Sequence, residues 1–187
     1  GNTNTWPIEM LRSGAVYVAA GFGRIAGGTL IGQTLGNAIY NKSGNGVVFD
    51  ASARDLEGLS AIEGFNAFVR DFHPSFLEES TLMGVNTPAR IGHAIVMPGD
   101  LVMAQREGVL FIPAHLVADV VVKAEFIILR DNFGFAMINS NTYTSGQIDN
   151  QWTDEIKAAS LKWLDANPEE LQMTREELDR LMKDRTW

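Results

Sequence analysis

The segment GVVFDASARDLEGL, residues 46–59, limits the possible folds more than any other part of the chain. It opens with VVF, an apolar and β-branched run in which polar residues do not alternate. Such a run is typical of a strand in a parallel sheet that is covered on both faces. Apolar residues at helical spacing flank it: Leu35, Ala38 and Ile39 before it, and Leu56, Leu59 and Ile62 after it. We therefore expect an α/β fold.

The pattern along the rest of the first 130 residues agrees with this fold class. We expect strands at residues 15–20, 67–72 and 89–97, and a hairpin over residues 100–113 that turns at residues 106–108. Pro113 is suited to a first helical position, so a long helix is predicted from there to residue 130. Residues 1–130 are therefore predicted to form an α/β core.

Residues 131–187 are predicted to be a linker and a helical C-terminal extension. Residues 139–151, NSNTYTSGQIDNQ, are polar, and two helices follow, one capped by Thr153 and one that begins with a capping box from Thr174 to Glu177. We expect the tryptophans of this extension to pack it onto a neighbouring subunit; they are Trp152, Trp163 and Trp187.

The composition of the 187 residues excludes several functions. The net charge is −8 and no basic stripe is present, which argues against binding to nucleic acid through phosphate contacts. The absence of cysteine excludes thiolate metal sites and cysteine nucleophiles. No apolar run approaches the roughly 20 residues that cross a bilayer, and the first ten residues lack the pattern of a signal peptide. We expect a cytoplasmic protein without membrane contact.

Arg54 and Asp55 stand side by side at the predicted end of the buried strand. Arginine grips a carboxylate with two parallel hydrogen bonds, and aspartate is an oxygen ligand of the kind that Mg²⁺ takes once or twice in a protein site. Together they could hold both ends of one substrate, the carboxylate on Arg54 and a carbonyl-polarising metal on Asp55. The alternative is a surface salt bridge in which Asp55 caps the next helix.

Gly32 precedes a predicted helix whose first free amides belong to Gln33, Thr34 and Leu35. Such a helix start attracts a carboxylate or phosphate through its N–H groups and dipole. Glycines that only permit close packing are the alternative. The earlier glycines give GxGxxxG, one residue longer than the dinucleotide fingerprint, so nucleotide binding is not expected. Of the three histidines, only His73 is expected near a site.

Two longer segments resemble the RraA-like family, which includes the regulator of ribonuclease activity A and divalent-metal aldolases for 4-hydroxy-4-methyl-2-oxoglutarate and 4-carboxy-4-hydroxy-2-oxoadipate. They are GTLIGQTLGNAIYNKSGNGVVFDASARDLEGL and GHAIVMPGDLVMAQREGVLFIP. The resemblance runs from about Trp6 to Arg130. It implies the layered β-β-α swivelling type of α/β fold, and a homo-oligomer built as a trimer or a dimer of trimers.

The resemblance also assigns roles to individual residues. In the aldolases, the residue matching Arg54 binds the substrate carboxylate and the residue matching Asp55 holds Mg²⁺ or Mn²⁺. The backbone amides that follow the position of Gly32 bind the pyruvoyl carboxylate. The implied reaction is retro-aldol cleavage of a 4-hydroxy-2-oxo diacid, or decarboxylation of oxaloacetate, through a metal-stabilised pyruvate enolate.

Two departures from the family pattern bear on this reaction. The aldolases have an acidic residue at the position of Gln33, and an amide cannot accept a proton as a carboxylate does. Loss of acid–base assistance typically lowers a rate by about 10²- to 10⁴-fold. A non-catalytic regulatory protein that acts through protein contacts is therefore the alternative function. Family members also carry an N-terminal segment before the position of Trp6. Either a separate polypeptide supplies this segment, or the chain is a processed or truncated form.

Overall fold

The computed structural model describes residues 4–184, which divide into two compact units, Gly1–Ala114 and His115–Trp187. The first unit contains α-helices and short strands in this order: α1 (Trp6–Glu9), β1 (Tyr17–Thr29), α2 (Gln33–Ser43), β2 (Val47–Ala53), α3 (Leu56–Ser60), β3 (Ala67–Phe68), β4 (Asp71–Phe72), β5 (Ala89–Ile91), β6 (Ala94–Val96), β7 (Leu101–Gln105) and β8 (Gly108–Ile112). The predicted α/β fold is confirmed.

The central sheet of this unit is parallel, with β2 in the middle. β1 pairs with β2 on one side, and the short strands β3 and β4 pair with it on the other. Helix α2 connects β1 to β2, and α3 connects β2 to β3. The carboxyl ends of these strands therefore meet at one edge of the sheet, where Arg54 follows β2 and His73 follows β4.

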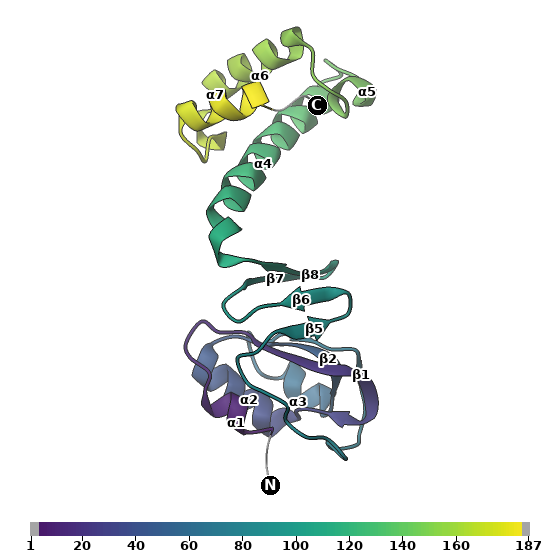
Figure 1. Cartoon of the computed structure of the whole chain (residues 1–187). Coiled ribbons are helices and arrows are strands. Elements are labelled where there is room, and N and C mark those ends of the chain that lie inside the picture. The colour runs from purple at the N-terminus through teal and green to yellow at the C-terminus, as the bar shows by residue number, and fades with distance from the viewer. Residues whose placement is uncertain (1–3, 185–187) are drawn as a thin grey trace. The chain divides into compact units, whose positions relative to one another are not determined.

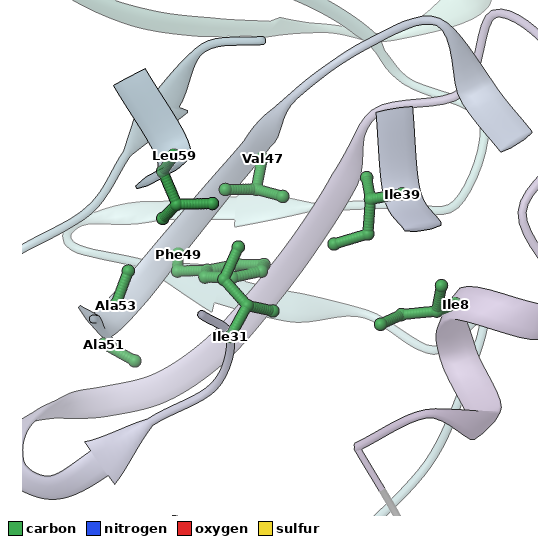
Figure 2. Packing of buried hydrophobic residues seen from close by; sticks show 8 residues of the cluster. All are labelled: Ile8, Ile31, Ile39, Val47, Phe49, Ala51, Ala53 and Leu59. Carbon is green, nitrogen blue, oxygen red and sulfur yellow. The ribbon is translucent and has the colours of Figure 1, made fainter. Parts of the chain in front are cut away.

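The core lies between this sheet and the helices α1 to α3, which gather on one side of β1 and β2 (Figure 1). All seven residues of β2 are buried, as the VVF run predicts. Alternate β2 side chains, from Val47 to Ala53, enter the cluster with Ile8, Ile39 and Leu59 from the three helices (Figure 2). Two glycines permit this packing, because a Cβ on Gly36 would lie 2.3 Å from Leu59 Cδ2 and one on Gly21 would lie 2.5 Å from Ala51 Cβ.

Three strand predictions are wrong in detail. The strand predicted at residues 15–20 spans Tyr17–Thr29 and runs through the glycine-rich segment. Its register shifts once between Ala19 and Arg24, where Phe22 and Gly23 have positive φ, and again between Arg24 and Thr29. The strand predicted at residues 67–72 is two short strands, β3 and β4. The strand predicted at residues 89–97 is a hairpin, since Gly92 adopts φ 57° and reverses the chain between β5 and β6. The hairpin predicted over residues 100–113 is confirmed as β7 and β8.

The second unit is helical and has its own core. Its elements are a 3-10 turn η1 (Ala114–Leu116, which begins at the unit boundary), α4 (Val117–Asn139), α5 (Ser145–Ile148), α6 (Asp154–Ala166), the 3-10 turn η2 (Pro168–Glu170) and α7 (Arg175–Asp184). Thr153 caps α6 through the amide of Ile156, as predicted. Thr174 and Glu177 form the expected capping box, in which each side chain bonds the other residue's amide. The predicted C-terminal helical region is confirmed.

The helix predicted to end at residue 130 continues to Asn139, across the predicted boundary between core and extension. It belongs to the second unit because Phe126 and Leu129 pack with Leu164, Leu178 and Leu181. The three leucines come from α6 and α7, so α4 packs against both of these helices in the helical core. Within residues 4–184, no helix combines the length and apolar character of a membrane span.

Trp152 and Trp163 pack within this unit, on Phe133, whereas they were expected to pack the extension onto a neighbouring subunit. Trp152 is 6% exposed and its ring lies 5.1 Å from that of Phe133, while the ring of Trp163 lies 5.8 Å from Phe133. The guanidinium of Arg130 lies 5.2 Å from the centre of the Trp152 ring. Aromatic side chains bury a large apolar area, so Trp152 and Trp163 contribute to the core of this unit. Trp187 lies outside the described residues.

Candidate functional site

Arg54 and Asp55 lie at the carboxyl end of β2, where the fully buried strand leaves the sheet. The backbone amide of Arg54 donates to the carbonyl of Ile31 at 3.0 Å, which fixes the strand end beside the segment that leads into α2. The side chains of Arg54 and Asp55 are 42% and 48% exposed, and Arg54 Nε lies 3.7 Å from Asp55 Oδ2. Both charged groups are therefore accessible to a ligand.

Asp55 adopts a left-handed backbone conformation, with φ 58° and ψ 48°. Aspartate tolerates this region better than most residues, because its short polar side chain can bond locally. Asp55 occupies the N-cap position of α3, yet its side chain makes no capping hydrogen bond to that helix. Instead, its Oδ2 accepts the backbone amide of Gln33 at 3.0 Å. The carboxylate therefore caps α2, the neighbouring helix. Two parts of the alternative are present, namely the ion pair with Arg54 and the place of Asp55 at the start of α3, but the side chain does not cap α3.

Gly32 is the residue that allows α2 to approach the charged pair. A Cβ at this position would lie 2.3 Å from Asp55 Oδ2 and 2.9 Å from Arg54 Nε. The close-packing interpretation of this glycine is therefore supported, and the side chains that pack against it are those of the charged pair. Anion binding at the helix start stays a prediction.

Gln33 lies next to Asp55, but its backbone amide does not have the role expected for it, which was to bind a ligand. The N–H of Gln33 is used by Asp55, so it does not point into open space. Thr34 and Leu35 follow in the first turn of α2, where amides have no carbonyl four residues back within the helix. The side chain of Gln33 lies against α3, since a Cβ on Gly58 would be 2.5 Å from Gln33 Oε1. Thr34 and Leu35 are therefore the amides that remain for a ligand carboxylate.

The donor set around Asp55 suits a divalent cation that keeps most of its water ligands. Among the described residues, no three His, Asp or Glu side chains gather as a metal site. Mg²⁺ commonly takes only one or two protein carboxylates and fills its other positions with water and substrate. Asp55 offers its second oxygen, Oδ1, which accepts no hydrogen bond from another described residue. A single half-exposed carboxylate fits this weak mode of binding.

A network of hydroxyl groups, which no pattern in the sequence indicates, joins β1, β2 and the segment after β4 beside this site. Thr29 Oγ1 lies 3.1 Å from Ser52 Oγ and 3.4 Å from Ser75 Oγ. Ser75 Oγ lies 2.9 Å from His73 Nδ1. These residues come from β1, β2 and the segment after β4, so no local spacing in the sequence relates them. His73, the histidine expected near a site, is thereby placed at the carboxyl edge of the sheet.

The remaining histidines lie elsewhere. His93 is exposed in the turn between β5 and β6, and His115 lies in η1. Neither is part of the group formed by Arg54, Asp55 and the start of α2.

The chain matches the family model described as RraA-like: Aldolase/RraA, over residues 5–111. The matched range contains the whole charged site and ends within β8.

Solved structures match in fold. The RNA-processing inhibitor RraA from Thermus thermophilis is 24% identical with a TM-score of 0.52, and the match covers 57% of this chain and 63% of that one. An unusual member of the RNase ES inhibitor RraA protein family from Streptomyces coelicolor is 26% identical with a TM-score of 0.58, covering 63% and 59%. An uncharacterized protein from Pseudomonas syringae pv. tomato str. DC3000 is 25% identical with a TM-score of 0.68, covering 76% and 70%. The chain spans less than two thirds of the first two proteins.

Proposed function

Since this chain belongs to the RraA-like family, we propose that it is a divalent-metal-dependent lyase that acts on a 2-oxo acid. One observation supports this most directly. Arg54 and Asp55, both nearly half-exposed, lie side by side at the carboxyl end of β2 and face the start of α2. An anion-binding group, a cation-binding group and a helix N-terminus then converge on one place.

In this proposal, each part of the site binds a different part of the substrate. The Arg54 guanidinium and the amides of Thr34 and Leu35 bind the carboxylate next to the 2-oxo group. Asp55 holds Mg²⁺ or Mn²⁺, and its hydrogen bond from Gln33 keeps the carboxylate oriented. When bound, the cation would polarise the 2-oxo carbonyl and make the adjacent carbon–carbon bond easier to break.

Gln33 favours decarboxylation of oxaloacetate over aldol cleavage. Retro-aldol cleavage needs a base to remove the proton of the 4-hydroxyl group, and an amide side chain cannot act as that base. Loss of carbon dioxide needs no proton abstraction, and water can supply the proton that the product takes up. A slow decarboxylase is therefore the activity we expect first.

A test with purified protein measures pyruvate released from oxaloacetate and from a panel of 4-hydroxy-2-oxo diacids, with Mg²⁺ or Mn²⁺ and then with chelator. Protein-free samples with the same metal correct for spontaneous decarboxylation. Asp55→Ala is expected to abolish the release, whereas Glu57→Gln removes an exposed carboxylate from the same helix region and should not. Release that persists at wild-type rate in Asp55→Ala would contradict the assignment of the site.

A non-catalytic regulatory role is the second candidate, and the same residue favours it. Gln33 removes the proton-transferring group from the site, and two matched structures are described as RNA-processing or RNase inhibitors. If no substrate of the panel is turned over, a binding role through protein contact becomes the better proposal. Capture of a ribonuclease by the immobilised chain would then be the measurement of choice.

We also propose that the chain forms a homo-oligomer, as a trimer or a dimer of trimers. Large apolar side chains of the first unit are solvent-exposed in the single chain, including Phe22 at 83% and Met83 at 89%. Exposed apolar side chains of this size are typical of protein interfaces where they form a patch. Light scattering that gives the mass of one chain would contradict the proposal.

A further inference from the structure

His73 lies one strand away from Arg54, in matching register. β4 runs parallel to β2 with Phe72 beside Ala53, and the amide of His73 donates to the carbonyl of Ala53 at 2.9 Å. The next pair in this register is Arg54 and His73, at the edge where both strands end. Neighbouring strands lie about 4.8 Å apart, so both side chains start from adjacent points of the same edge.

The hydrogen bonds of the His73 ring determine which nitrogen carries the proton. His73 Nδ1 accepts the backbone amide of Ser75 at 3.2 Å, and a backbone N–H can only donate. The hydroxyl of Ser75 accepts the amide of Gly27 at 2.8 Å, which leaves its own hydrogen free to point at Nδ1, 2.9 Å away. Nδ1 is therefore an acceptor, and the neutral ring carries its hydrogen on Nε2.

The ring is also held in place. Its partner Ser75 belongs to the hydroxyl network with Thr29 and Ser52, which are 3% and 0% exposed. The Ser52 hydroxyl in turn donates to the carbonyl of Ile25 at 2.7 Å. The His73 residue itself is partly exposed, and within residues 4–184 its Nε2 makes no hydrogen bond. An oriented N–H donor is thus available to a ligand beside Arg54.

We propose that His73 is a further substrate-binding residue, whose Nε2–H donates to the second carboxylate of a 2-oxo diacid. The inference rests on the proposed function and deepens it. A hydrogen bond from His73 to the second carboxylate would make the site selective for diacids over monoacids. Arg54 binds the carboxylate next to the 2-oxo group, and His73 binds the distal one. In a four-carbon diacid the two carboxyl carbons are three bonds apart, at most about 4 Å, so two side chains that start from neighbouring strands, about 4.8 Å apart, can each reach one carboxylate.

Two substitutions separate this role from a structural one. His73→Asn keeps a group near the position of Nδ1, which can still bond Ser75, but removes the donor at the position of Nε2. His73→Gln places an amide N–H near the position of Nε2. His93→Asn is the matched control, since His93 is exposed and lies outside the site.

The experiment measures KM for oxaloacetate and the inhibition constant of pyruvate, which lacks the distal carboxylate. A hydrogen bond to a charged group corresponds to about 10- to 100-fold in affinity. His73→Asn should raise KM for oxaloacetate by that factor while the inhibition constant of pyruvate stays within about twofold of wild type. His73→Gln should restore part of the loss, and His93→Asn should match wild type.

Two results would overturn the inference while the proposed function stands. One is an unchanged KM for oxaloacetate in His73→Asn, and the other is an equal weakening of oxaloacetate and pyruvate, which would show a purely structural role. A wild-type protein that neither releases pyruvate nor binds it, by calorimetry, would instead remove the proposed function, and the role of His73 with it. Thermal unfolding of each variant, followed by circular dichroism, verifies that the fold is retained.

Discussion

The carboxylate of Asp55 accepts the backbone amide of Gln33 at 3.0 Å, so the residue that follows β2 and Arg54 caps the helix that precedes β2. This hydrogen bond joins the two βαβ connections at the edge of the sheet. It also gives Asp55 two tasks, because the same carboxylate is the proposed cation ligand. Substitutions at Asp55 should therefore affect both stability and activity, and the two effects can be separated.

Asp55→Asn should retain most of the stability and lose the activity. Asparagine tolerates the left-handed conformation and offers an oxygen to the Gln33 amide, but it carries no charge for a cation. Asp55→Ala loses both properties and should be less stable than Asp55→Asn by about 1 kcal/mol, the typical contribution of a cap. Urea unfolding measures the stability difference, and metal-dependent pyruvate release measures activity. Equal stability of the two variants would show that the cap contributes nothing.

Gly32→Ala should disable the site with little loss of stability. The new Cβ would lie 2.3 Å from Asp55 Oδ2 and 2.9 Å from Arg54 Nε, so both side chains must move away. These groups are half-exposed and have room to move, and the φ of −127° at Gly32 suits alanine. We expect pyruvate binding measured by calorimetry to weaken by at least about tenfold, the loss of one charge-assisted contact.

Gly146→Ala is the control for this substitution, since its Cβ would meet no atom within 4 Å and it lies in the other unit. Unchanged pyruvate binding in Gly32→Ala would mean that Arg54 and Asp55 do not bind the ligand in the arrangement seen here.

Arg70→Met should destabilise the first unit by about 1–3 kcal/mol, the penalty for a buried polar group that loses its partner. Asp50 lies in the buried strand β2 and is 7% exposed, and Arg70 Nε is its ion-pair partner. The charge of Asp50 would remain in the sheet without a cation. Combining Arg70→Met with Asp50→Asn removes that charge and should recover part of the loss. A strictly additive double-mutant cycle in urea unfolding would argue against coupling between the two.

The stability of the first unit should decrease at alkaline pH because of Tyr17. Burial raises the pKa of the Tyr17 hydroxyl to about 12 from 10.0. Its ring packs edge-on against Phe49, 5.0 Å away, in the core. Above pH 10 the unfolded chain releases the proton while the folded one retains it, so a rising pH favours unfolding. The contribution is fully present below pH 10 and is lost at about 1.4 kcal/mol per pH unit as the pH rises towards 12.

Urea unfolding of the wild type and Tyr17→Phe from pH 8 to 11.5 measures this dependence. The difference between the two should grow in favour of the variant above pH 10, because phenylalanine has no proton to lose. Parallel curves across the range would show that Tyr17 is not the responsible group.

The fold class, the buried strand and the position of the charged pair could be predicted from the amino-acid sequence. These depend on local patterns: the unalternating VVF run, helical spacing on either side of it, and a polar pair where the apolar run ends. Caps such as Thr153 and the Thr174–Glu177 box were also predictable, since every partner lies within three residues. The geometry of a helix cap depends on the few residues that form it, so it can be predicted wherever that short sequence pattern occurs.

Which groups the site contains, and which hydrogen bonds they make, follows from the way the chain folds in three dimensions and could not be predicted from local patterns. Asp55 bonds Gln33, 22 residues away. His73 is held by Ser75, whose hydroxyl is linked in turn to Thr29 on another strand. The strand ends of a parallel sheet bring such residues together, and their spacing in the sequence depends on the lengths of the connecting helices and loops. Side-chain direction at those ends depends on backbone conformations such as the left-handed one of Asp55, which only the packed surroundings select.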